Sequence, residues 1–596
     1  MTEKLNPETW DEINKVVPDV VEGTPDPNVV DGTSYAWPTD SNGEKLDVDE
    51  IMENAKAMTM ESTITKPTIK MLSIMEKEIE FFKSNNTDVY ASVKKESGTT
   101  HLKVESTEFQ DYVKYLCYNN KVMPTEALSK NLIQIIKVKT LHNDSPIEAI
   151  HFRLGWEKDQ KTLWILRSVD PKVEYIKVTK DRWSKELECP IKIIVGSDSG
   201  SLPDPVADKD GDFSLLNDYL NVSDEHIPLT EAWLLEASLG SEFPILSIQG
   251  EAGTGKSTLI EILHCLIDPV LKNDGTIGGT LRPMYKDSWS MFASAKRTHL
   301  LAMDNLSKVK DFFNDVLCQI ATGGSYEART HQTMEDTTKL STVNPVIIGS
   351  ISQVSEAPDV LRRSVYIRTI YLGKNKSKLK SEFWDSFYKD LPTIYSGYLN
   401  LLVYVLQNRE SIQPENIESM TDFWITGRVL ELFMKDKWTI TFDEAMEQMT
   451  LKASQDLEEQ NPLIQLIIKY YNNQPDTELA MTTSEWNEKL FSKTDDSETD
   501  YLIKQLSRTE VRALGKQFAT LQPLLRKLGY EFNKKRTSKS NQWILSNPNR
   551  HSTNSTNSTN RDETPPSESG MSGMSGNNPT DIFGNRTKNY RTHDDF

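Results

Sequence analysis

The spacing of apolar residues divides the chain into segments of different secondary structure. From about Pro67 onward, Met71, Met75 and Ile79 recur at helical spacing, which predicts an amphipathic helix. Between roughly 100 and 195 the pattern predicts strands, with β-rich runs at 151–156, 163–166 and 175–178. We therefore predict an N-terminal α+β region over 61–195. A linker rich in Gly, Pro, Asp and Ser is expected at 196–212.

From residue 213 the pattern alternates between helices and short apolar strands. A helix is predicted at 229–239, and strands are predicted at 244–248, 299–303, 345–348 and 365–370. One helix face between the second and third strands carries Phe312, Phe313, Val316, Leu317 and Ile320. This alternation is typical of an α/β fold with a parallel sheet, and it places an α/β domain at 213–375.

The remaining segments differ in composition. Residues 376–458 are helical and rich in aromatic side chains, as expected of a helical lid, and 459–546 form a smaller unit that ends in a strand-like run at 542–545. Residues 1–60 hold fourteen acidic against four basic side chains, and they predict a disordered lead. Residues 547–596 begin with Asn-Ser-Thr repeats and predict a disordered tail.

Composition and charge narrow the class of protein. The 596 residues carry a formal net charge of −20, which argues against a general coat of positive charge for nucleic acid but allows a local basic surface. No run approaches eighteen apolar residues, and the first residues lack a signal-peptide pattern, so no membrane span is expected. The four cysteines form no CxxC pair and suit a reducing compartment. We expect a cytoplasmic protein.

A glycine-rich motif follows the predicted strand at 244–248 and opens a predicted helix. Such glycines let backbone N–H groups wrap phosphates, the lysine reaches the β- and γ-phosphates, and the next hydroxyl holds Mg²⁺. The pattern in this position predicts a P-loop that binds ATP and magnesium. Its residues are Gly250, Glu251, Ala252, Gly253, Thr254, Gly255, Lys256, Ser257 and Thr258.

An acidic residue closes the next predicted strand. Asp304 follows 299–303, where a P-loop ATPase places its magnesium carboxylate. The following residue is Asn305, where many such ATPases carry a glutamate that polarises water. Either another residue, such as Glu251 or Glu327, acts as the base, or hydrolysis is slow.

Two segments beyond Asp304 carry cations. Residues 323–344 predict a turn and a hairpin with strands at 329–333 and 337–342, where ring helicases place a pore element. His331 and Lys339 are candidates to contact a DNA backbone there, unless the hairpin is simply a solvated surface. Arg363, with Arg362 as the reserve, precedes the fourth strand, where an arginine can reach the γ-phosphate bound by a neighbouring subunit.

The order of these motifs resembles superfamily-three helicases and poxvirus-type primase-helicases, within the AAA+ class. It is more similar still to ATPase–helicase proteins of prophages, phage satellites and other mobile elements. The shared residues are the motif at 250–258, the run 304–307, residues 321–324 with Arg329, the pair Arg362–Arg363, the run 420–423 and the segment 512–529.

The resemblance implies a hexameric, ATP-driven DNA helicase or replication initiator in a bacterial host cell. It also implies an AAA+ core and a C-terminal winged helix. Relatives tend to carry asparagine after the third strand to sense the γ-phosphate, whereas this chain has Gly349 there. Ser350 and Asn344 are the possible substitutes. The rival function is a non-unwinding ATPase switch or loader, in defence or assembly, that binds DNA or a protein partner.

The C-terminal unit favours nucleic-acid contact on its own composition. Residues 508–545 hold nine Lys/Arg against two acidic residues, a local reversal of sign. Lys534, Lys535 and Arg536 are expected in a hairpin wing, where they could bridge phosphates. We expect single-stranded DNA in the pore and duplex at the winged helix. The acidic tip that ends at Phe596 is a candidate to recruit a replication partner, although plain disorder is the simpler interpretation.

Overall fold

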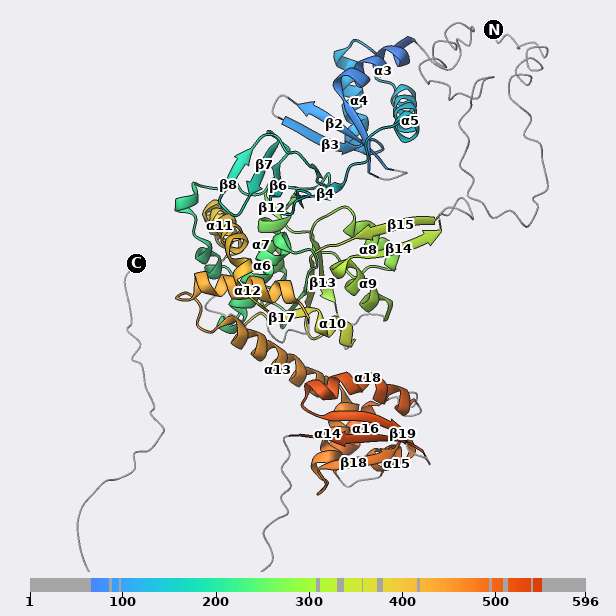
Figure 1. The fold of residues 1–596 in the computed structure, drawn as a ribbon, viewed down its shortest axis with the longest axis vertical. Coiled ribbons are helices and arrows are strands. Elements are labelled where there is room, and N and C mark those ends of the chain that lie inside the picture. Colours follow the sequence, from blue (N-terminus) through green and yellow to red (C-terminus); the bar gives the residue numbers. More distant parts are fainter. Residues whose placement is uncertain are drawn as a thin grey trace, which may run out of the picture. The chain divides into compact units, whose positions relative to one another are not determined.

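The structure, a computed structural model, describes residues 66–84, 88–95, 98–306, 311–329, 337–355, 357–371, 379–414, 419–492, 496–506, 513–536 and 540–548. It separates into two compact units, Met1–Gln465 and Leu466–Phe596 (Figure 1). None of the helices in these ranges is long and apolar enough to cross a bilayer. The predicted lead at 1–60 lies outside the described residues, as does the predicted tail apart from 547–548.

The first unit begins with a small α+β region. A three-stranded antiparallel sheet of β1 (Glu80–Lys83), β2 (Val89–Lys95) and β3 (Gly98–Lys103) packs with α3 (Lys66–Glu78), α4 (Thr107–Asn119) and α5 (Glu126–His142). The prediction of strands from residue 100 onward was wrong for 107–142. Ser106 and Thr125 cap the two helices by accepting backbone N–H bonds, a helix-start signal that the strand interpretation overlooked.

Two further sheets follow. β5 (Leu154–Trp156), β6 (Leu163–Ser168), β7 (Glu174–Val178) and β8 (Trp183–Glu186) form an antiparallel sheet, and β4 (Ile150–Phe152) pairs in parallel with β9 (Lys192–Ile194). The predicted single strand at 151–156 is therefore two strands in different sheets. Arg153 separates them, because its φ of 64° is incompatible with a continuous strand.

The predicted linker at 196–212 is packed rather than free. Leu202 is buried, and its N–H bonds to the carbonyl of Arg167 at 2.8 Å. The N–H of Gly200 bonds to the carbonyl of Pro269 at 2.8 Å. The short 3₁₀ helix η1 (Asp208–Asp210) lies within this segment, and η2 (Phe213–Asp218) and η3 (Asp224–His226) follow it.

A four-stranded parallel sheet forms the centre of the first unit. Its order is β13 (Leu301–Leu306), β16 (Val346–Ser350), β10 (Ile245–Gln249) and β17 (Ser364–Arg368). All four predicted strands of the α/β domain are thereby confirmed, with bounds shifted by one to three residues. Because the strands are parallel, their carboxyl ends share one edge of the sheet.

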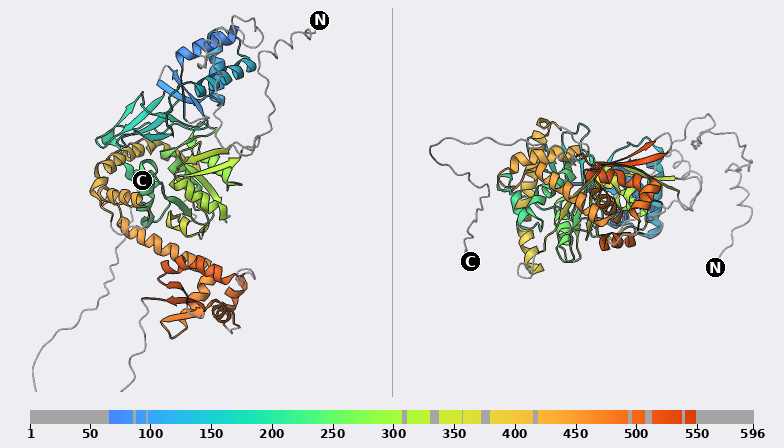
Figure 2. Two further views of the ribbon diagram at one scale, coloured as in Figure 1. Left: turned by 45° about the vertical axis from the view of Figure 1, so that its right-hand side comes forward. Right: turned by 90° about the horizontal axis from the view of Figure 1, so that it is seen from below.

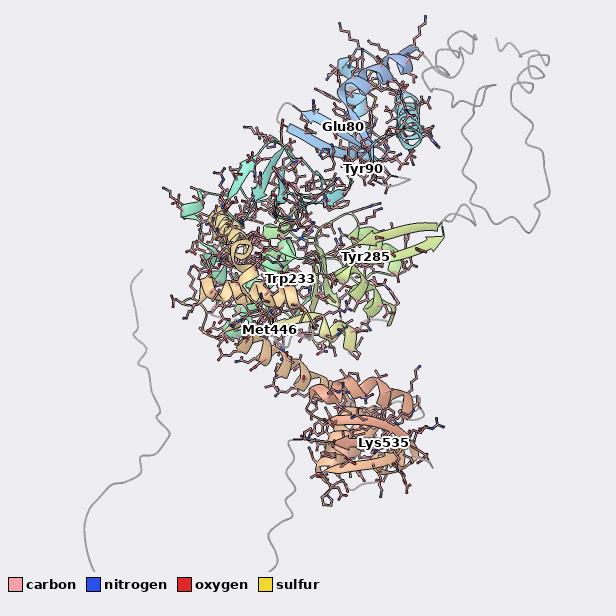
Figure 3. The ribbon with its side chains drawn as sticks, viewed as in Figure 1. Glu80, Tyr90, Trp233, Tyr285, Met446 and Lys535 are labelled. Carbon is pink, nitrogen blue, oxygen red and sulfur yellow. The ribbon has the colours of Figure 1, made fainter. Side chains whose placement is uncertain are left out.

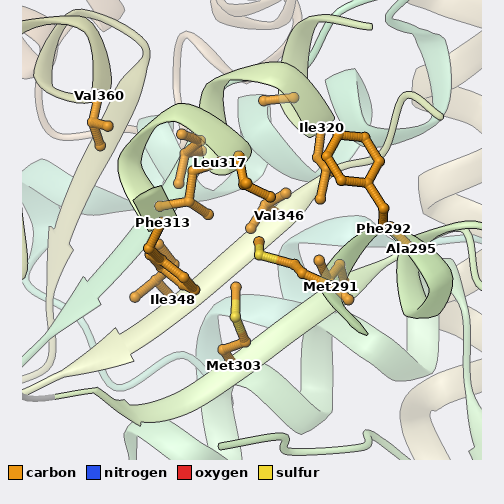
Figure 4. Packing of buried hydrophobic residues seen from close by; sticks show 14 of the residues in the cluster. Met291, Phe292, Ala295, Met303, Phe313, Leu317, Ile320, Val346, Ile348 and Val360 are labelled. Atoms are coloured by element: carbon orange, nitrogen blue, oxygen red, sulfur yellow. The ribbon is translucent and has the colours of Figure 1, made fainter. Parts of the chain in front are cut away.

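Helices cover this sheet. They are α6 (Ile227–Leu239), α7 (Lys256–Ile267), α8 (Ser288–Ala295), α9 (Asp311–Thr322) and α10 (Pro358–Arg362). On one face, Phe313, Leu317 and Ile320 of α9 pack against Val346 and Ile348 of β16 (Figure 4). The predicted face of α9 is thus confirmed as part of the core.

Two hairpins extend from this core. β11 (Val270–Leu271) pairs with β12 (Ile277–Gly278), and β14 (Gly324–Arg329) pairs with β15 (Thr337–Thr342). The second strand of the predicted hairpin is confirmed, whereas the first was placed too late in the chain, at 329–333. Gly323, with φ of 87°, turns the chain directly from α9 into β14, so the strand begins at once.

Three helices complete the first unit: α11 (Lys380–Asn408), α12 (Thr421–Met434) and α13 (Phe442–Gln460), with η4 (Arg409–Ser411) between the first two. α11 lies beside β7 and β8, as Figures 1 and 2 show, and Trp183 Nε1 donates to Asn400 Oδ1 at 2.8 Å. α6 packs against all three helices, and its residues Pro228 to Leu239 are buried, including the labelled Trp233 (Figure 3).

The second unit is smaller. α14 (Pro462–Asn472) leads into it, and β18 (Glu478–Thr482), α15 (Thr483–Leu490), α16 (Ser497–Gln505), α18 (Leu514–Lys527), β19 (Glu531–Arg536) and β20 (Asn541–Ser546) follow. The three strands form an antiparallel sheet in the order β18-β20-β19. Trp486, Phe518, Phe532 and Trp543 form its aromatic core.

Candidate nucleotide site

The glycine-rich loop 250–255 joins the central strand β10 to the first turn of α7. Gly250, Gly253 and Gly255 adopt φ values of 159°, 82° and 82°. A Cβ on Gly250 would lie 2.1 Å from Thr369 Oγ1, so only glycine fits between the loop and the segment that follows β17. The loop therefore occupies the carboxyl edge of the sheet and precedes a helix N-terminus, a place suited to phosphate.

Lys256 is folded back over this loop. Its Nζ donates to the carbonyl oxygens of Gly250 and Glu251, at 2.8 Å each, and the residue is only 8% exposed. Both partners are neutral carbonyls, so the ammonium charge has no anion in these contacts. A phosphate group would supply one.

Ser257 and Asp304 meet at the same edge. Ser257 Oγ donates to Asp304 Oδ2 at 2.5 Å, and Asp304, in the second half of β13, is 4% exposed. The pairing of β13 with β16 shifts register between Met303 and Leu306, so Asp304 lies in a bulge. A hydroxyl and a carboxylate in contact form the oxygen pair that a P-loop ATPase uses for Mg²⁺.

The neighbouring strand leaves room for this carboxylate. A Cβ on Gly349 of β16 would lie 2.3 Å from Asp304 Oδ1 and 3.0 Å from Ile260 of α7. Gly349 is therefore needed for the position of Asp304. The same crowding prevents this position from carrying an asparagine, the residue that the resemblance led us to expect as the sensor.

Neither alternative sensor residue lies beside Asp304: Ser350 is on the opposite face of the sheet, and Asn344 is at its opposite edge. Ser350 is Cα partner of Gln249 and Leu306, and alternation along β16 places it on the face of Ile348, which packs against α9. Asn344 precedes the amino end of β16, where its Nδ2 donates to the carbonyls of Ala295, Thr298 and His299.

Asn305 is exposed and has a φ of 60°, and its N–H donates to Asp304 Oδ1 at 2.7 Å. The two alternative bases are placed differently. Glu251 is an exposed residue of the glycine-rich loop itself. Glu327 belongs to β14, in a two-stranded sheet separate from the parallel sheet, where it is Cα partner of Lys339.

Sequence reasoning missed two residues that fix the loop. Asn221 Nδ2 donates to the carbonyls of Thr254 and Ile370, at 2.7 Å each. Thr369 and Thr254 share a hydrogen bond between hydroxyls at 2.6 Å. Single polar residues in irregular segments carry no periodicity, so no sequence signal pointed to them.

Arg363 lies at the opposite edge of the same sheet. Its carbonyl accepts from the N–H of Ile245, the first residue of β10, at 2.8 Å. The four-residue rise of β10 to Gln249 therefore separates it from the loop, by about 13 Å. Its Nε is buried without a hydrogen-bond partner among the described residues. Arg362 is exposed and pairs with Asp359 at 3.2 Å.

The DNA-contact candidates divide between the two units. His331 lies outside the described residues, and for Lys339 the structure describes only the backbone, in β15. The basic strand, by which we mean Lys534, Lys535 and Arg536 of β19, is exposed; Lys535 is labelled in Figure 3. Lys534 Nζ lies 5.7 Å from the ring centre of Trp543, a cation–π distance.

Some buried ionisable groups of the first unit lie outside the site. Burial raises the pKa values of Glu231 and Glu236 in α6 to about 7. Burial would also raise the pKa of Asp268, but the charges of Arg153 and His299 outweigh it and lower that pKa to about 2. No group of three or more potential metal ligands occurs among the described residues.

Comparison with known proteins gives one family match. Residues 214–429 match the family "Actinomycete integrative conjugative element replication protein". That range runs from η2 into α12 and includes the glycine-rich loop, Asp304 and Arg363. No curated protein matches the chain. The match connects the α/β core with replication proteins of mobile elements.

Solved structures give a weaker likeness. Two structures of the C-terminal region of NrS-1 without ligand each cover 81% of this chain and 99% of their own, at 11% sequence identity. Their TM-scores are 0.34 and 0.32, which are too low to carry an argument about this chain.

Proposed function

We propose that this chain is an ATP-driven DNA helicase or replication initiator of a phage or other mobile genetic element. The observation that carries the proposal is the meeting of Lys256, Ser257 and Asp304 at the carboxyl edge of a parallel sheet. These three side chains are the cation, hydroxyl and carboxylate that P-loop enzymes use for nucleoside triphosphate hydrolysis.

The residues fit ATP and magnesium. Backbone N–H groups of 250–255 and the charge of Lys256 would hold the phosphates, and Ser257 and Asp304 would hold Mg²⁺. When bound, the ion neutralises charge on the β- and γ-phosphates. The exposed side chain of Asn305 is next to Asp304 and would orient the attacking water, although an amide is a weaker base than the glutamate it replaces.

The position of Arg363 supports the proposal that the chain assembles into a ring. Its separation from the loop by the length of β10 prevents it from reaching a phosphate on its own chain. A head-to-tail neighbour would bring one copy's amino edge against the next copy's loop. We therefore propose a ring, most simply a hexamer, in which Arg363 or Arg362 stabilises transition-state charge in trans.

DNA would be engaged at two places. The hairpin β14–β15, with Lys339, would contact single-stranded DNA in the pore, together with His331, which lies outside the described residues. In the second unit, helices α15, α16 and α18 and the strands β18-β20-β19 support the proposal of a winged helix, in which the basic strand would form part of the wing. It would contact phosphates of duplex DNA.

The family match at 214–429 supports the assignment to mobile-element replication, since replication proteins need strand separation at an origin. The decisive experiment is strand displacement by the full chain on a 5′- and 3′-forked duplex with ATP. Lys256→Ala serves as the matched negative control. ATP-dependent unwinding by the wild type, absent in the variant, is expected.

A second candidate function is favoured by one observation, the amide side chain of Asn305 at the position where many P-loop ATPases carry a glutamate. A slow ATPase would suit a switch or loader that binds DNA or a partner without unwinding. ATP-dependent DNA binding with no displaced strand would select this second function. Failure to bind ATP at all would exclude both.

A further inference from the structure

The direction of a bound nucleotide follows from the site, given the proposed function on which this inference rests. Ser257 and Asp304 would hold the Mg²⁺ that neutralises the terminal phosphates of ATP, so their contact would mark the γ-phosphate end. Asp304 belongs to β13, and the sheet order is β13-β16-β10-β17. The nucleoside end therefore extends away from β13, toward β17.

Two segments lie against the glycine-rich loop on the side of β17: one contains Asn221 and Val222, and the other contains Thr369 and Ile370. The N–H of Thr369 bonds to the carbonyl of Gln249 at 2.8 Å, and Val222 and Thr369 form an antiparallel bridge. Asn221 then fastens both segments to the loop through the carbonyls of Thr254 and Ile370. A group bound against these two segments would therefore have a fixed position relative to the glycine-rich loop and to the phosphates it would hold.

Large apolar side chains are exposed at this point. Ile370 is 45% exposed and Tyr371 is 69% exposed, directly after the fixed Thr369. Exposure of such side chains to water is unfavourable, and covering them with an apolar or aromatic surface is favourable. On the other side of the loop, Ile351 is also exposed, but it follows β16, on the Asp304 side.

We propose that Ile370 and Tyr371 form the binding surface for the base of the nucleotide, with Asn221 as its polar contact. Both hydrogens of Asn221 Nδ2 are donated to carbonyls, which fixes the orientation of the amide. Its Oδ1 accepts no hydrogen bond from the described residues and is left as an acceptor. An acceptor suits the amino group of adenine and repels the carbonyl that guanine and hypoxanthine carry at the same position.

A second copy of the chain is the other possible cover for this surface. The base is favoured because the exposed pair lies on the side to which the nucleoside must extend, whereas a docking face for a copy would have no reason to follow that direction. The experiment below separates the two.

The test measures binding of ATP, ITP and inorganic tripolyphosphate to the full chain by calorimetry, with magnesium present. Loss of one stacked base contact by alanine substitution typically weakens binding about 5- to 150-fold. Tyr371→Ala should weaken ATP and ITP by a factor in this range and leave tripolyphosphate within about twofold. Tyr371→Phe should retain most of the ATP affinity. Ile351→Ala, the matched control across the loop, should leave ATP affinity unchanged. The wild type should prefer ATP to ITP.

Other outcomes overturn the inference in distinguishable ways. If Tyr371→Ala weakens binding of ATP and of tripolyphosphate equally, Tyr371 supports the structure of the loop and does not contact the base. Unchanged ATP affinity with loss of assembly, seen by native mass spectrometry, would assign the surface to a second copy. Equal affinity for ATP and ITP in the wild type would remove Asn221 from base recognition. Binding of tripolyphosphate with failure of the base tests would overturn this inference alone, whereas no binding of any of the three would overturn the proposed function with it.

Discussion

Arg153 Nε donates to Asp268 Oδ1 at 2.8 Å, and both side chains are almost completely buried. Arg153 separates β4 from β5, whereas Asp268 caps the carboxyl end of α7, the helix that begins at Lys256. The remaining N–H groups of Arg153 donate to the carbonyls of Leu166, Gly200 and Pro269. One buried ion pair thus ties the N-terminal sheets to the nucleotide-site helix.

Removing one member of this pair should destabilise the first unit strongly. Arg153→Met leaves Asp268 buried without its cation, which typically costs roughly 3–5 kcal/mol. The check is urea unfolding followed by tryptophan fluorescence. Lys185→Met, which breaks an exposed pair with Asp204, is the control and should change stability by less than about 1 kcal/mol. A comparable small change for Arg153→Met would show that the buried pair adds no stability.

The buried carboxyls of Glu231 and Glu236 should make stability depend on pH. Their folded pKa values of about 7 lie above the ordinary 4.5, because burial disfavours the charged form. Between pH 4.5 and pH 7 the two carboxyls are therefore protonated in the folded chain but ionised in the unfolded chain. Because the folded chain binds more protons, the free energy of unfolding should fall as pH rises from about 4.5 to about 7. Glu231→Gln and Glu236→Gln should each flatten that slope. Glu447→Gln, at an exposed position of α13, should leave the slope unchanged. A wild-type stability that is flat over this range would contradict the assignment.

Gly349→Ala should impair hydrolysis by displacing Asp304. The added methyl would meet Asp304 Oδ1 at 2.3 Å, so the carboxylate or β16 must move. We expect at least tenfold slower ATP turnover, about 1.4 kcal/mol in the barrier, with a raised magnesium requirement. Gly515→Ala, whose nearest neighbour would be an ordinary 3.4 Å away, is the control. Unaltered turnover over a range of magnesium concentrations would show that the crowding is relieved without consequence.

Arg363→Ala should bind ATP but hydrolyse it poorly if the arginine acts on a neighbouring copy. The decisive measurement mixes Arg363→Ala with Lys256→Ala chains, each nearly inactive alone. In a ring, some interfaces then pair an intact Lys256 with an intact Arg363, so part of the ATPase activity should return. Mixed oligomers are confirmed by native mass spectrometry. If such oligomers form and no activity returns, the arrangement in trans is wrong.

Charge reversal in the basic strand should weaken DNA binding. Replacing Lys534, Lys535 and Arg536 by glutamate removes up to three phosphate contacts, and each lost contact lowers the slope of log K against log salt by about 0.9. Binding is measured by fluorescence anisotropy between low and moderate salt. Lys504→Glu, at an exposed position of α16, is the matched control, and basal ATPase should not change. An unchanged slope would contradict a phosphate contact by the basic strand and leave Lys339 in β15 as the preferred candidate for DNA contact.

The sequence predicted the parallel sheet well because its strands are short, apolar and regularly alternated with helices. Leu246, Ile248, Ile347 and Ile348 are buried as their pattern required. The glycine-rich motif also located its own strand and helix. The prediction failed at 107–142. The β-rich pattern after residue 150 was extended to this earlier segment, which in fact forms two capped helices.

The candidate site was predictable only where a residue belongs to a motif. Lys256, Ser257 and Asp304 follow a fixed order along the chain, so their meeting could be expected. Asn221 and Thr369 touch the loop from segments distant in sequence, and such contacts leave no local pattern. Ser350 illustrates a different difficulty, because a shift of one residue in a strand turns the side chain to the opposite face.

The burial of α6 on all sides has a practical consequence for dissecting the protein. Its partners α11, α12 and α13 come from residues 380–460, more than 140 positions later in the chain. Trp438 and Thr426 also supply the hydrogen bonds that Glu231 and Glu236 accept. A fragment that stops after β17 would expose to water the apolar side of α6 that packs against these helices, with two carboxyls stripped of their donors, and would aggregate. Any soluble fragment that retains the nucleotide loop must therefore extend at least through Gln460.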